Sequence, residues 1–86
     1  MYDELLALAN GVGDGGELSL AKYHFQALSL IAEKAGTKLK STDYKDLGGG
    51  SVMISAKVFR SLVLNADRNF DLDAAFAATY PQNVAA

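Results

Sequence analysis

Residues 51–66 (SVMISAKVFRSLVLNA) constrain the fold most, because their apolar side chains recur at helical spacing on two adjacent stripes. One stripe contains Ile54, Val58 and Leu62, and the other contains Val52, Ala56, Phe59, Val63 and Ala66. A helix that is apolar over so wide an arc is normally buried on more than one side. The whole chain has 86 residues, which make one small domain (1–86) with little material to surround such a helix.

We therefore predict that this helix is covered by a second copy of the chain or by another protein. The residues expected at that interface are Val52, Ala56, Phe59, Leu62 and Val63. On this interpretation the chain is a non-catalytic interaction or regulatory module, which assembles through the helix as a homodimer or a larger complex.

Apolar spacing and helix-end signals predict three further helices. The clearest one follows Ser19, a suitable N-cap, and stops at Gly36, where a left-handed residue is favoured. The last helix is expected to open at Asp71 or Asp73, whose carboxylates can accept free N–H groups of the first turn, and to end before Pro81. The predicted fold is all-α, with about four helices at 2–9, 19–35, 51–66 and 71–80.

Two glycine-rich segments divide the chain. Residues 11–16 (GVGDGG) follow a predicted helix rather than a strand and precede Glu17, so they do not form a phosphate-binding loop. Residues 37–50 form a polar connection with one predicted helical turn near 43–47. This connection ends in three consecutive glycines, which we expect to act as a hinge.

The segment 51–55 is rich in β-favouring residues, so a short strand is an alternative to the first turns of the third helix. A strand at 52–56 followed by helices at 58–69 and 71–80 resembles the ribbon-helix-helix DNA-binding proteins. That resemblance implies that Met53, Ser55 and Lys57 would face the major groove. Only one of the three is basic, the net charge of the chain is −2, and no segment is strongly basic. Nucleic acid is therefore not an expected partner.

No combination of side chains forms a complete catalytic or metal site. The chain has no cysteine and one histidine, His24, whose neighbours three and four residues away along a helix include no carboxylate. The acids at Asp67, Asp71 and Asp73 lack the spacing and the final glutamate of a calcium loop. We expect no catalytic residue, no metal and no cofactor, and a binding protein rather than an enzyme.

A different resemblance spans residues 27–83. The segments LNADR at 64–68 and DLDAAF at 71–76, with Asn83 after them, resemble the MazG-like all-α nucleotide pyrophosphohydrolases. Members of that family bind magnesium through a Glu-Glu-x-x-Glu run and a Glu-x-x-Asp run on successive helices. The first run aligns with Glu33 and Lys34, of which only Glu33 keeps its acid, and the second places Lys57 where an aspartate is expected.

This resemblance implies a nucleotide-binding protein with lost or altered hydrolase activity, in which Lys34 and Lys57 contact phosphate directly. No apolar run approaches the roughly 18 residues needed to cross a bilayer. The acidic start at Asp3 and Glu4 is unlike the basic region of a signal peptide. The expected location is the cytoplasm, without membrane contact.

Overall fold

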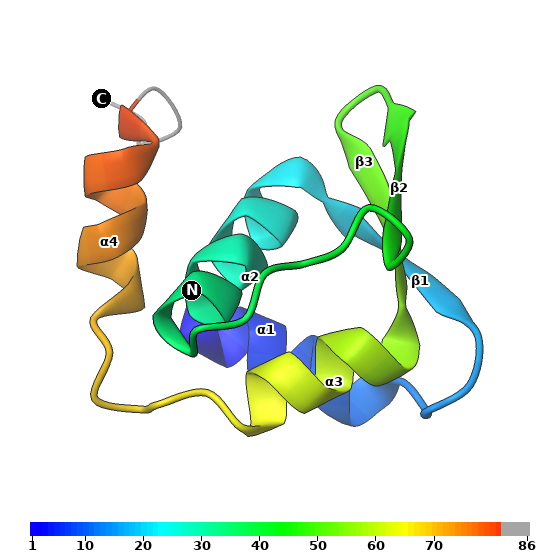
Figure 1. Ribbon diagram of the computed structural model, residues 1–86, viewed down its shortest axis with the longest axis horizontal. Helices are drawn as coiled ribbons and strands as arrows, with labels where there is room; N and C mark the ends of the chain where they lie inside the picture. Colours follow the sequence, from blue (N-terminus) through cyan, green and yellow to red (C-terminus); the bar gives the residue numbers. More distant parts are fainter. Residues whose placement is uncertain (82–86) are drawn as a thin grey trace.

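The computed structural model describes residues 1–81 (Figure 1). This part of the chain contains four helices and a three-stranded antiparallel sheet, so the fold is mixed α/β and the predicted all-α fold is wrong. The elements follow in the order α1 (Tyr2–Gly11), β1 (Glu17–Ala21), α2 (Lys22–Lys34), β2 (Tyr44–Gly48), β3 (Ser51–Ser55), α3 (Ala56–Leu64) and α4 (Leu72–Thr79). Among residues 1–81, no helix combines the length and the apolar character that a membrane span requires.

The segments predicted as the first turns of α2 and α3 are strands in the structure. The helix expected at 19–35 begins only at Lys22, after β1, and the helix expected at 51–66 begins only at Ala56, after β3. The physical reason is alternating burial. In each strand, the side chains at every second position point toward the core. These side chains are Leu18 and Leu20 in β1, and Val52 and Ile54 in β3.

The strand alternative at 51–55 is therefore confirmed, whereas the predicted helical turn near 43–47 is wrong because that segment is β2. β3 is the central strand of the sheet, which has the order β1-β3-β2. The turn that joins β2 to β3 contains Gly48, Gly49 and Gly50, with φ angles of 75°, 60° and 86°. Only glycine adopts these left-handed conformations without steric cost, so the predicted hinge is a hairpin turn.

The helical ends were predicted more closely than the strands. Asp71 is the N-cap of α4, and its carboxylate accepts a hydrogen bond from the Ala74 N–H at 3.1 Å. Gly36 follows α2 with a φ of 76°, and the Thr37 N–H returns to the Ala32 carbonyl at 2.8 Å. Both the predicted Asp71 cap and the predicted stop at Gly36 are confirmed.

The core lies between the inner face of the sheet and the helices. α2 and α3 pack against both β1 and β3, and α4 packs against the side of α2 that faces away from the sheet (Figure 1). The opposite face of the sheet carries no helix, and its side chains are exposed or half-buried. The largest fully buried side chains are Phe59, Leu5, Leu20, Leu28, Ile54, Val52 and Val63.

Two hydrogen bonds hold α1 against α3, and one ion pair joins α3 to the loop after α1. The Tyr2 hydroxyl donates to the Val63 carbonyl at 2.6 Å. The Arg60 guanidinium donates from Nε to the Ala9 carbonyl at 3.1 Å and pairs through Nη1 with the Asp14 carboxylate at 2.6 Å. α1 therefore covers part of α3, the helix for which the sequence predicted a partner from outside the chain.

The alternating burial in β3 predicts unequal losses of stability for two adjacent substitutions. Ile54 is fully buried, so Ile54→Ala should lower the free energy of unfolding by about 2–5 kcal/mol. Met53 lies on the open face and is half-buried, so Met53→Ala should cost less than about 1 kcal/mol. Urea unfolding of the two variants measures the difference, and equal losses would contradict the strand assignment.

Candidate functional site

The five predicted interface residues lie mainly inside the chain's own core. The exposed fractions are 2% for Val52 and Ala56 and 0% for Phe59 and Val63. Leu62 alone is half-buried. The sheet and α1 supply the covering that the sequence analysis assigned to a second chain, so four of the five side chains have no surface left for a partner.

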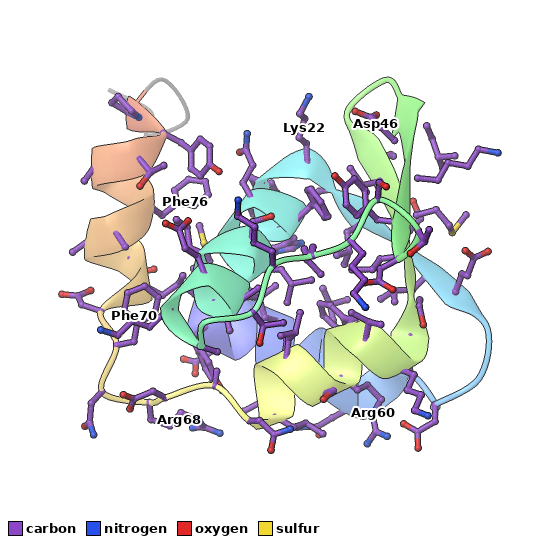
Figure 2. All side chains as sticks on the ribbon, in the orientation of Figure 1. Lys22, Asp46, Arg60, Arg68, Phe70 and Phe76 are labelled. Carbon is purple, nitrogen blue, oxygen red and sulfur yellow. The ribbon has the colours of Figure 1, made fainter. Side chains whose placement is uncertain are left out.

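Leu62 lies on the floor of a groove between the C-terminal end of α2, the 35–43 connection and α3. Two adjoining pockets of about 360 Å³ and about 310 Å³ form this groove, and they share Thr37, Ser61 and Leu62. The other apolar side chains of the lining are Ile31, Ala35, Leu39, Val58, Ala66 and Phe70. Figure 2 shows Phe70 in the connection before α4, at the side of the molecule where α2 ends. Apolar side chains thus line both pockets, with Leu62 between them.

Four lysines border the groove. Lys34 lines one pocket, and Lys38, Lys40 and Lys57 line the other. Lys34 and Lys57, the two predicted phosphate contacts, come from different helices and line different pockets of this groove. The Lys34 ammonium lies 5.8 Å from the centroid of the Phe70 ring, and both residues line the first of the two pockets.

The groove has few acids to balance these lysines. Its lining includes Asp43 and Asp67, and each carboxylate accepts a backbone N–H, from Lys40 at 3.2 Å and from Asn69 at 2.9 Å. Four lysines and two aspartates give the lining a net charge of +2 in a chain whose net charge is −2. Among residues 1–81, none of the four lysines forms an ion pair. Their charges therefore remain available to an anionic ligand.

His24 does not belong to this groove. Its ring is 13% exposed and lies against Tyr23, with ring centroids 4.1 Å apart. Nε2 is buried and without a hydrogen bond, and the nearest carboxylate, from Glu4 in α1, is 3.9 Å away. Sequence spacing could not find this neighbour, because Glu4 approaches from another helix. In the described part of the chain, no three histidine, aspartate or glutamate side chains gather closely enough to hold a metal ion.

The DNA-binding interpretation requires a free strand at 51–55. The order of strand and two helices is present, and Met53 and Ser55 do face the open side of the sheet. However, β3 is paired on both edges within the chain, by β1 and by β2. It therefore cannot form the two-chain ribbon that the ribbon-helix-helix proteins use.

Sequence reasoning missed the residues that join the two lysines into one site. Thr37, Ser61 and Asn65 add polar groups to the lining, and Lys38 and Lys40 add charge. The spacing of Lys34, Lys38 and Lys40 along one segment was the available signal. Comparison with known protein families, with curated proteins and with solved structures found no match. The MazG-like resemblance accordingly stays a prediction.

The burial of the predicted interface residues predicts different outcomes for two acidic substitutions. Phe59→Asp places an unpaired charge in the core and should lower the free energy of unfolding by about 3–5 kcal/mol. Leu62→Asp can reach water from the groove floor and should lose only about 1 kcal/mol. Thermal unfolding by circular dichroism compares them. A Leu62→Asp variant that unfolds as readily as Phe59→Asp would show that Leu62 is not at an open surface.

Proposed function

We propose that this chain is a non-catalytic interaction module that binds an acidic, partly apolar segment of another protein in the groove between α2 and α3. The observation that carries the proposal is the placement of Lys34, Lys38, Lys40 and Lys57 around an apolar floor. The proposal keeps the interaction module expected from the sequence but moves its binding surface from the apolar stripe of α3 to the groove. The cytoplasmic location stays a prediction.

The apolar floor favours a peptide over a small phosphate compound. A nucleotide would satisfy the lysines, but its single base could not cover the apolar side chains of both pockets, so part of Leu62, Leu39 and Val58 would stay in water. A segment with alternating acidic and apolar side chains can satisfy both, because carboxylates reach the bordering lysines while apolar groups cover the floor. Nucleotide binding through Lys34 and Lys57 remains the alternative that the same experiment examines.

The lysines act as point charges on flexible stems, so their main effect is on recognition and association rate. Exposed charges are screened by salt, and the Debye length falls to about 3 Å at 1 M ionic strength. The affinity of a ligand for this groove should therefore fall as salt is added. The contribution of apolar contacts to that affinity should remain.

The test is a titration of the protein with a short fluorescent peptide of alternating glutamate and leucine, followed by fluorescence polarisation. We expect Lys34→Glu and Lys57→Glu each to weaken binding about tenfold, which corresponds to about 1.4 kcal/mol. Lys45→Glu is the matched control, because it makes the same charge change on the open face of the sheet, away from the groove.

Two comparison ligands separate the alternatives. A glutamate-only peptide of equal length should bind more weakly than the glutamate–leucine peptide, since it cannot cover the floor. Binding of ATP with no binding of either peptide would overturn the proposal in favour of a nucleotide site. Equal losses from Lys57→Glu and Lys45→Glu would also overturn it, because they would show a dependence on net charge alone.

A further inference from the structure

We propose that the free edge of β1 pairs antiparallel with β1 of a second copy of the chain, about a two-fold axis at Ser19. This proposal concerns a surface outside the lysine groove and does not depend on it. β1 is an outer strand of the sheet, which has the order β1-β3-β2.

The backbone bonding shows which groups of β1 face the free edge. The Lys22 N–H donates to the Gly50 carbonyl at 2.8 Å, and the Ala56 N–H donates to the Gly16 carbonyl at 3.0 Å. In an antiparallel pair, hydrogen-bonded and non-hydrogen-bonded positions alternate, so the even-numbered residues of β1 bond to β3. The N–H groups of 17, 19 and 21 and the carbonyls of 17 and 19 therefore point away from the sheet.

The two outer edges of the sheet differ in how they are protected. On the β2 edge, the register shifts between Asp46 and Gly48, and the Asp46 carboxylate accepts the Gly48 N–H at 2.9 Å. β2 also contains Lys45, and bulges and lysines are common devices against edge pairing. β1 has neither a bulge nor a lysine nor a proline within its five residues. The β1 edge is thus the one that is open to another strand.

The β1 edge is complementary to itself. With Ser19 opposite the partner's Ser19, Glu17 lies opposite the partner's Ala21, so no like charges face each other on the open side of the sheet. On the inner face, Leu18 is half-buried, and the partner's strand would cover its exposed part; Leu20 is already buried in its own copy. Self-pairing thus brings no like charges together and covers the exposed part of Leu18, which favours a second copy as the occupant of this edge.

The pairing provides four backbone hydrogen bonds between the copies, two at Ser19 and two from Ala21 N–H groups to the partner's Glu17 carbonyl. The carbonyl of Ala21 is not counted, because this residue is the N-cap of α2 and its carbonyl serves the first helical turn. A single strand per copy makes a small interface, so we expect a weak dimer that dissociates on dilution.

A charge exchange at Ser19 tests the two-fold arrangement. Ser19 is exposed on the open face, so Ser19→Lys and Ser19→Glu should leave the monomer folded. Each variant alone would place like charges directly opposite one another and should dimerise at least tenfold more weakly than the unmodified chain. An equal mixture should recover the dimer, because lysine then faces glutamate.

Sedimentation velocity over a dilution series measures these masses, with thermal unfolding as the check on folding. Ser41→Lys and Ser41→Glu are the matched controls, since they introduce the same charges before β2 and should leave the dimer unchanged. The proposal is overturned if the unmodified chain is a monomer at about 1 mM, where even a binding free energy of about −4 kcal/mol gives association. It is also overturned if the single variants dimerise as the unmodified chain does.

Discussion

The antiparallel pairing of β1 with β3 determines the rest of the architecture. Each strand runs into its helix without an intervening residue, so that Ala21 is followed by α2 and Ser55 by α3. The pairing extends into the first helical residues, through the bonds that Lys22 and Ala56 make to Gly50 and Gly16. Two helices that begin at opposite ends of one strand pair are thereby held over the same face of the sheet. The groove between α2 and α3 is a consequence of that placement.

Local signals were sufficient where an element depends on its own residues. The cap at Asp71 and the stop at Gly36 are such cases, because both satisfy backbone groups within a few positions along the chain. The strands depend on partners far away in sequence. The spacing of Leu18, Leu20 and the apolar residues after them fits a helical stripe as well as an alternating strand, and only the pairing with β3 decides between them.

The same distinction applies to the site. The apolar stripe of α3 predicted an intermolecular interface at Phe59 and Val63, because no local pattern shows that α1 folds back over α3. Lys34 and Lys57 were predicted from the MazG-like resemblance. The fold places both on the groove for a different reason, which is the packing of their helices. Lys34 is the last residue of α2 and Lys57 is the second residue of α3, and both helices pack on the same sheet. The path of the 35–43 connection determines which other side chains line the groove, and no local sequence pattern encodes that path.

The two proposed surfaces are geometrically compatible. Pairing through β1 would continue the sheet in the order β2-β3-β1-β1-β3-β2, and a two-fold axis perpendicular to that sheet keeps the helices of both copies on one side. Both lysine-bordered grooves would then face the same side of the dimer. A partner that carries two acidic segments could occupy both, and its second contact would form at a high effective concentration. Weak self-association and weak groove binding would therefore reinforce each other, since each copy added to the partner favours pairing of the next.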